Sequence, residues 1–183
     1  MDIALIVHAG AGDYPPHYMG PAQKGCREAV LAGWHILQNK GLALDAVEAA
    51  VRVLEDNPLY NAGTGSSLTS EGKIEMDAGI MDGATLQIGA VAGVELIKNP
   101  IKLARKVLES PHVMLIGHGA QQFALEHDIS LCTYENLLTE QVHKRWQEQR
   151  AAKVWEKEWK HGTVGQWPLM APDVWLLQPQ LAV

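Results

Sequence analysis

The residues best suited to do chemistry form the run His161-Gly162-Thr163-Val164-Gly165. A threonine hydroxyl is a weak nucleophile at neutral pH and needs a base beside it. A break in the peptide bond before Thr163 would free an α-amine, whose usual pKa of about 7.7–8.0 suits that role. Gly162 would allow the backbone conformations that such a break requires. The run therefore indicates an N-terminal nucleophile, although a turn is the commoner explanation of a glycine-flanked threonine taken alone.

Other kinds of site are disfavoured by the same sequence. Gly10-Ala11-Gly12 follows an apolar run, but Pro15 stands where a dinucleotide-binding loop has its third glycine. The eight histidines include no pair at ligand spacing beside a carboxylate or cysteine, which argues against zinc. Asp77 and Asp82 could serve as acid and base, yet aspartates that shape turns are commoner. We therefore predict a structural role for both aspartates.

Composition limits the class of protein. A chain of 183 residues is one domain or a large part of one. With 15 Lys and Arg against 21 Asp and Glu, nucleic acid and anionic membranes are disfavoured as partners. Cys26 and Cys132 form no disulfide framework and suit a reducing compartment. Because no signal peptide or membrane span is recognisable, we expect a cytoplasmic protein.

The elements that must position Thr163 are predicted in an α/β order. Strands are expected at residues 3–7, 73–76, 86–94 and 113–116, and helices from Pro21, from about residue 43, from Pro100 and at 120–126. The first helix is expected to bury Cys26, Val30, Leu31, Trp34 and Leu37 and to end at Asn39-Lys40-Gly41. Residues 133–162 are predicted to form a flexible, partly helical linker to the cleavage site.

Five segments in residues 1–165 together carry a resemblance to a known family. They are His8-Ala9-Gly10-Ala11-Gly12, 54–65 (Leu-Glu-Asp-Asn-Pro-Leu-Tyr-Asn-Ala-Gly-Thr-Gly), 75–83 (Glu-Met-Asp-Ala-Gly-Ile-Met-Asp-Gly), 99–105 (Asn-Pro-Ile-Lys-Leu-Ala-Arg) and His161-Gly162-Thr163-Val164-Gly165. In this order they resemble the plant-type L-asparaginases, also called isoaspartyl peptidases or β-aspartyl-peptidases, of the N-terminal nucleophile hydrolases. Ala9 departs from the family pattern, which has glycine there.

The resemblance implies a fold and a substrate class. Family precursors cut themselves before the threonine into α and β subunits, which form an αββα sandwich and an (αβ)2 dimer. Residues 1–162 would be the α-subunit-like part and residues 163–183 the start of a β subunit, so the sandwich would be incomplete. The family hydrolyses L-asparagine and isoaspartyl dipeptides, and Gly162 favours that branch over the related glycosylasparaginases.

The resemblance also implies the roles of individual residues. Thr163 would be the nucleophile that forms an acyl-enzyme, and Asn61 would support it by hydrogen bonding. A structural sodium ion would be held, mostly by backbone carbonyls, at Leu54, Glu55, Asn57, Tyr60, Ala62 and Thr64, a choice of ligands that suits a hard cation. A helix end and turn without an ion remains the alternative. No catalytic cofactor is implied, and the substrate-binding residues would lie beyond Thr163.

Residues 166–183 depart from the family pattern. Their codons can be read one frame over as the family's usual continuation, so we expect a one-base deletion at Gly165/Gln166 that leaves this tail out of frame. On this hypothesis the chain is an inactive truncated form. Two alternatives stay open: an α part complemented by a separate β subunit, and a non-catalytic binding protein that keeps the sodium loop.

Overall fold

The computed structural model describes residues 3–10 and 16–152. In chain order its elements are α1 (Pro16–Gln38), α2 (Ala43–Glu55), β1 (Met76–Met81), β2 (Ile88–Val94), α3 (Pro100–Leu108), β3 (Met114–Ile116), α4 (Gly117–Glu126), α5 (Tyr134–Leu137) and α6 (Glu140–Ala151). The described part is therefore mixed α/β, as predicted.

The three described strands form one sheet in the order β1-β2-β3. β1 and β2 form an antiparallel hairpin, while β3 runs parallel to β2 after the crossover through α3. Met76 pairs with Val94 and Ala78 with Val91, so two β2 residues, Ala92 and Gly93, lie opposite Asp77 and form a bulge. The Asp77 carboxylate accepts a hydrogen bond from the Gly93 N–H at 2.7 Å. This contact supports the predicted structural role of Asp77.

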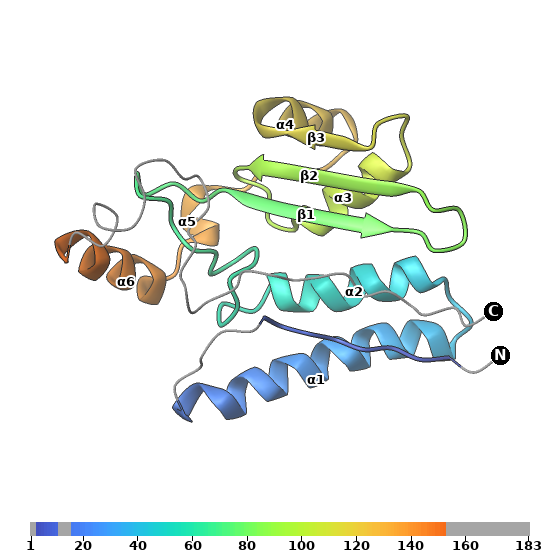
Figure 1. Cartoon of the computed structure of the whole chain (residues 1–183), viewed down its shortest axis with the longest axis horizontal. Helices are drawn as coiled ribbons and strands as arrows, with labels where there is room; N and C mark the ends of the chain where they lie inside the picture. Colours follow the sequence, from blue (N-terminus) through green and yellow to red (C-terminus); the bar gives the residue numbers. More distant parts are fainter. Residues whose placement is uncertain (1–2, 11–15, 153–183) are drawn as a thin grey trace.

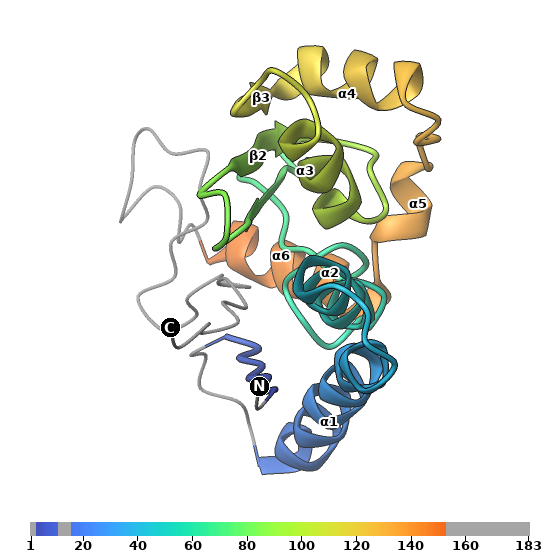
Figure 2. The same cartoon turned by 90° about the vertical axis from the view of Figure 1, so that its right-hand side faces the viewer.

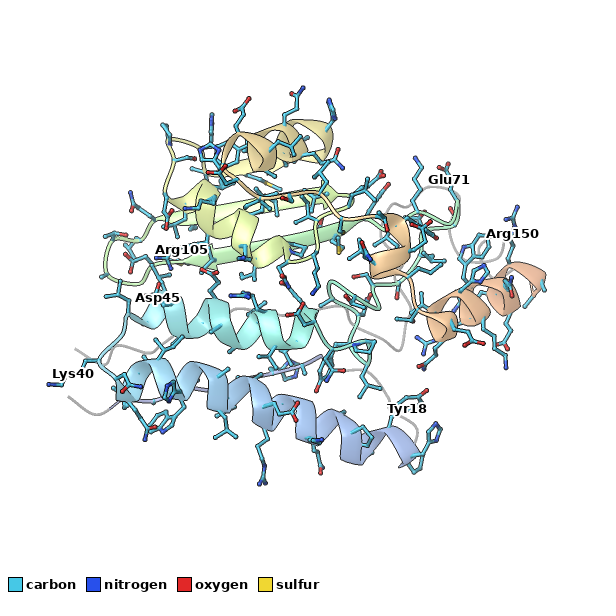
Figure 3. The ribbon with its side chains drawn as sticks, turned by 180° about the vertical axis from the view of Figure 1, so that it is seen from behind. Tyr18, Lys40, Asp45, Glu71, Arg105 and Arg150 are labelled. Atoms are coloured by element: carbon cyan, nitrogen blue, oxygen red, sulfur yellow. The ribbon has the colours of Figure 1, made fainter. Side chains whose placement is uncertain are left out.

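The helices stack in layers beside this sheet (Figures 1 and 2). α3 packs on one face of β1 and β2, α2 packs against α3, and α1 packs against α2 on the outside. The side chains that fill the space between them are fully or almost fully buried and include Leu54, Val91, Val94, Leu103 and Val107. An ion pair between Arg105 Nη1 and Asp45 Oδ1, at 3.3 Å, joins α3 to the start of α2 (Figure 3).

The buried face of α1 differs from the predicted one. Gly25, Ala29 and Gly33 are buried, whereas the predicted Cys26, Val30, Trp34 and Leu37 are only partly buried and Leu31 is 58% exposed. The reason is close approach, since a Cβ atom at Gly33 would lie 2.6 Å from the Ala46 carbonyl oxygen of α2. Small residues thus form the contact, and the larger ones flank it.

The start of α1 was also predicted wrongly. The helix begins at Pro16 and continues through Pro21. Pro21 is the sixth of the 23 residues of this helix, where proline removes one N–H donor from the helical hydrogen bonds.

The remaining helix and strand predictions vary in accuracy. The second helix, the start of α3 at Pro100, β3 and α4 are confirmed to within a few residues. The strand at 73–76 is wrong, because β1 begins at Met76 and Lys73 closes a turn through the Thr69 N–H to Lys73 carbonyl bond at 2.8 Å. Residues 3–7 pair with none of the described strands, although Leu5 and Val7 pack partly against the core.

The expected linker, residues 133–162, is described as far as residue 152. This part contains α5 and α6, and Leu137 is fully buried. α5 thus packs on the core through Leu137, whereas α6 contains no buried residue, and a flexible linker to the cleavage site stays a prediction.

Candidate functional site

The loop that carries Asn61 connects α2 to β1, and we call residues 56–73 the Asn61 loop. It begins with a turn in which Asn57 Oδ1 accepts from the Leu59 N–H at 3.1 Å, because an asparagine side chain can mimic a backbone turn. Asn61 is exposed, and its Oδ1 accepts from the Ser67 N–H at 2.6 Å. The carboxamide of Asn61 is thus held in one orientation by its own loop.

Two glycines let the loop fold back onto the end of α2. Gly63 and Gly65 have φ values of +55° and +97°, a region that glycine adopts at no steric cost. A Cβ atom at Gly65 would lie 2.6 Å from the Pro58 carbonyl oxygen. The Thr64 N–H then donates to the Glu55 carbonyl at 2.8 Å, which closes the loop on the last residue of α2.

Glu55 ties the same region to α3 through its side chain. Glu55 is only 3% exposed, and its Oε1 accepts from the Ile101 N–H in the first turn of α3 at 2.9 Å. Burial raises the pKa of Glu55 to about 8, against the opposing effect of the Ile101 hydrogen bond. Its Oε2 atom is buried without a hydrogen-bond partner among the described residues. This side-chain role was not predicted from the sequence, which gave Glu55 only as one of the residues that bind sodium.

The residues predicted to bind sodium offer carbonyl oxygens, the type of ligand that a hard cation prefers. The carbonyls of Glu55 and Asn57 accept one loop N–H each, which leaves a second lone pair on each oxygen, whereas the Leu54 carbonyl accepts from both Asp56 and Asn57. The Tyr60 hydroxyl donates to the Ala22 carbonyl of α1 at 2.6 Å, so Tyr60 would contribute its carbonyl. Within residues 3–10 and 16–152 no cluster of three or more His, Cys, Asp or Glu side chains could hold a metal. A cation here would therefore be held mainly by carbonyl oxygens, and its binding, including the contribution of Ala62 and Thr64, stays a prediction.

The second aspartate weighed as an acid or base shapes the β1–β2 turn. Asp82 Oδ1 accepts from the Ala84 N–H at 3.0 Å, and Oδ2 accepts from the Thr85 hydroxyl at 2.8 Å. These hydrogen bonds, with the Ala84 bond as the larger cause, hold the pKa of Asp82 below its usual value. The geometry supports the structural role predicted for it.

Several predicted functional residues cannot be placed beside Asn61. Gly162, Thr163 and the tail 166–183 lie outside the described residues. The pairing of Thr163 with Asn61 and the frame of the tail therefore stay predictions. Sequence reasoning also missed Tyr134 and Trp146, whose side chains bond to the Asn61 loop. The three tryptophans of residues 133–162 were the one available signal.

The family model Asparaginase_2, described as asparaginase, matches residues 1–172. The chain belongs to this asparaginase family. The predicted resemblance is thereby confirmed.

Individual relatives of this asparaginase-family chain agree with that assignment. It is 52% identical over 162 residues to the plant-type L-asparaginase of Pyrococcus abyssi, covering 86% of this chain and 52% of that protein. It is 53% identical over 161 residues to the plant-type L-asparaginase of Pyrococcus furiosus, covering 87% and 51%. It is 42% identical over 170 residues to the isoaspartyl peptidase/L-asparaginase of Rattus norvegicus, covering 90% and 51%. The chain spans about half the length of these curated relatives.

The described helices also bear on membrane insertion. Among residues 3–10 and 16–152, no helix combines the length and apolar character needed to cross a bilayer.

Proposed function

We propose that the chain supplies the α-subunit part, residues 1–162, of a hydrolase that acts on L-asparagine and isoaspartyl dipeptides, with Thr163 as its nucleophile. Relatives that carry these activities in their names match most of the chain. The observation that carries the proposal is the Asn61 loop, in which Ser67, Gly63 and Gly65 preset the position of Asn61. A catalytic group held before the substrate arrives needs no reorganisation during the reaction.

The proposed chemistry starts with hydrolysis of the peptide bond between Gly162 and Thr163. The freed α-amine takes the proton of the Thr163 hydroxyl, and the oxygen attacks the side-chain carbonyl carbon of the substrate. Ammonia or an amino acid leaves with that proton, and water then hydrolyses the ester to release aspartate. Because Ser67 engages the Asn61 oxygen, we expect the Asn61 Nδ2 group to donate toward Thr163.

A second sheet would complete the site on the side of the described sheet opposite α3. Side chains alternate between the two faces of a strand, so Ile88, Ala90 and Ala92 lie opposite the buried Val91. In the parallel pairing Met114 is in register with Ala90, and Ile116 with Ala92. We call these five residues, Ile88, Ala90, Ala92, Met114 and Ile116, the open sheet face. Ile88, Met114 and Ile116 are 43%, 52% and 66% exposed.

We propose that a β part packs on the open sheet face and gives the αββα sandwich, with an (αβ)2 dimer as the complete assembly. Large apolar side chains gathered on one exposed face are typical of an interaction surface. On this proposal the chain alone hydrolyses neither substrate, because the groups that bind the substrate belong to the β part.

The nucleophile is tested by intact-mass measurement on the purified chain. We expect a break between Gly162 and Thr163, which is lost in Thr163→Ala because alanine has no hydroxyl to attack the preceding carbonyl. A break that persists in Thr163→Ala, or a chain that stays whole, would contradict the role given to Thr163.

The contribution of the α part is tested by complementation. The remaining half of the Pyrococcus abyssi relative is supplied as a separate chain, and ammonia release from L-asparagine is measured. We expect hydrolysis in the mixture and a loss of about 10²–10³-fold with Asn61→Ala, as for removal of one preorganised donor. Asp82→Ala, which removes a comparable side-chain hydrogen bond outside the Asn61 loop, should keep the rate. An unchanged rate with Asn61→Ala would refute the role of Asn61.

A further inference from the structure

Four hydrogen bonds join the outer part of the Asn61 loop to the segment that contains α5 and α6. The Gly65 N–H donates to the Leu137 carbonyl at 2.9 Å, and the Thr64 hydroxyl donates to the Asn136 carbonyl at 3.5 Å. The Tyr134 hydroxyl donates to the Gly72 carbonyl at 2.8 Å, and Trp146 Nε1 donates to the Thr69 carbonyl at 2.9 Å. We call residues 133–151 the α5–α6 clamp.

The clamp has its own support and can therefore hold the loop. Leu137 is fully buried in the core, and Leu138 and Val142 pack partly against it. α5 begins with a capping box in which Thr133 and Asn136 bond to each other's backbone, and such a box satisfies N–H groups at a helix start. In α6 the Thr139 side chain accepts from the Val142 N–H at 3.2 Å.

Two aromatic side chains of the clamp, Tyr134 and Trp146, contact the loop around Gly72. Gly72 has a φ of +83°, and a Cβ atom there would lie 3.1 Å from the Trp146 ring, so the ring covers bare backbone. The Tyr134 hydroxyl is protonated at neutral pH and so can donate, and burial, followed by the charge of Glu135, raises its pKa further. The Arg150 guanidinium lies 5.0 Å from the centre of the Trp146 ring. Figure 3 shows Glu71 of the loop and Arg150 of α6 at the same end of the molecule.

The loop residues that the clamp contacts are close in sequence to Ser67, whose N–H orients the Asn61 side chain. Thr69 and Gly72 are held by the clamp, and Ser67, just before Thr69, donates to Asn61 Oδ1. On the other side of Ser67, the Gly65 N–H is held by Leu137. Movement of the loop away from the clamp would therefore move the Ser67 N–H and with it the Asn61 carboxamide.

We propose that Tyr134 and Trp146 are positioning residues that fix the Asn61 loop, and through it the Asn61 side chain, for reaction at Thr163. The part of this inference that concerns reaction at Thr163 rests on the proposed function. Its structural content, that the two side chains hold residues 61–73 in place, can be measured in the full chain without any reaction.

The test is amide hydrogen exchange of the full chain carrying Tyr134→Phe or Trp146→Phe. Each change keeps an aromatic ring and removes one donor to the loop, and a typical hydrogen bond contributes enough to change local opening roughly two- to tenfold. We expect the Gly65, Ser67 and Gly72 amides to exchange faster by that factor, with α2 and α3 unchanged. Trp146→Ala, which also removes the ring from Gly72, should have a larger effect at the same amides.

Tyr18→Phe and Trp34→Phe in α1 are the matched controls, because they make the same chemical changes outside the clamp. Unchanged exchange in the loop of both clamp variants, or faster exchange spread evenly over the chain, would overturn the proposal. Faster exchange confined to the loop supports it. The break at Gly162–Thr163 is scored on the same samples by intact mass, so failure of the proposed function is read separately from failure of the clamp.

The effect of the clamp on catalysis is measured separately, as turnover in the complemented mixture. Loss of turnover in Trp146→Phe with an unchanged melting temperature supports positioning of Asn61. Full turnover in a variant whose loop exchanges faster would overturn the link from the clamp to Asn61.

Discussion

Burying a carboxyl group costs free energy, and Glu55 is such a buried group in this chain. One of its oxygens accepts from the Ile101 N–H, and burial raises its pKa to about 8. Its carbonyl accepts from the Thr64 N–H. A single residue therefore joins the end of α2, the Asn61 loop and the start of α3.

Glutamine and leucine at position 55 should have different effects on stability. Glu55→Gln keeps an acceptor for the Ile101 N–H and needs no proton uptake on folding, so we expect a free energy of unfolding at neutral pH equal to or above the wild-type value. Glu55→Leu leaves the buried N–H without an acceptor, which costs about 1–3 kcal/mol. Urea unfolding of both variants measures the difference. Equal destabilisation by the two changes would show that the hydrogen bond to Ile101 is unimportant.

The sequence predicted residue roles well where the partner is near in the chain. Asp82 and its partner Ala84 lie two positions apart, and a turn aspartate is recognisable from such spacing. Glu55 and Ile101 lie 46 positions apart, and Trp146 and Thr69 lie 77 apart. No local pattern indicates contacts that depend on the packing of distant elements, so the side-chain roles of Glu55, Tyr134 and Trp146 could not be foreseen.

At the scale of elements, contacts between backbones set how closely helices and strands approach. Gly89 of β2 faces the backbone of α3, where an added Cβ atom would overlap the Ala104 oxygen and the Leu108 nitrogen. The contact between α1 and α2 depends on Gly33 in the same way. Periodicity of large apolar residues does not reveal such faces, which is why the predicted face of α1 was wrong.

Gly89→Ala should destabilise the protein by about 1–3 kcal/mol or more, because overpacking against backbone cannot be relieved by a change of side-chain rotamer. Thermal unfolding followed by circular dichroism measures the loss. Gly119→Ala in α4 is the matched control, since nothing lies within 4 Å of the added Cβ atom. Alanine favours a helix over glycine by up to about 1 kcal/mol, so this control should not lower the melting temperature.

The β1–β2 hairpin should contribute a pH-dependent stability through Asp82. Its pKa is lowered in the folded state, so its contribution is present above the unfolded pKa and is lost as pH falls through the folded pKa. Asp82→Asn removes the charge and the acceptor for the Thr85 hydroxyl. We expect the variant to melt below the wild type at neutral pH and this gap to close in acid. A gap that stays constant with pH would contradict an ionised role for Asp82.

Helices were predicted better than strands for a physical reason. A helix makes its hydrogen bonds within itself, so α2 and α3 are recognisable from residues 43–55 and from Pro100 alone. A strand needs a neighbour, and the apolar residues 3–7 pair with none of the described strands.

At the scale of the whole molecule, the open sheet face is the surface on which we propose that a β part packs. Its exposed Ile88, Met114 and Ile116 lie on the face of the sheet opposite the buried Val91. Exposed apolar side chains gathered on one face are typical of a surface that binds a partner.

Ile116→Lys should prevent association with the β part while sparing the fold. Ile116 is 66% exposed, so we expect the free energy of unfolding to change by no more than about 0.5 kcal/mol. Burying the lysine charge in an interface is costly, and the complemented activity should fall by roughly tenfold or more. Leu31→Lys is the matched control, since Leu31 is 58% exposed on α1, outside the open sheet face. Equal losses in both variants would refute this face as the interface.

The α5–α6 clamp has a consequence for the order in which the chain folds. The α1–α2 pair, the β1–β2 hairpin and the β2–α3–β3 unit each join neighbouring segments, whereas the clamp bonds join residues 62 and 77 positions apart. Contacts between residues far apart in the sequence form slowly, because closing the intervening chain costs entropy before the contacts stabilise the fold. We expect the body to form first and the Asn61 loop to become ordered last, after the ribosome has released Trp146. Assembly of the reactive geometry would then be the final event of folding.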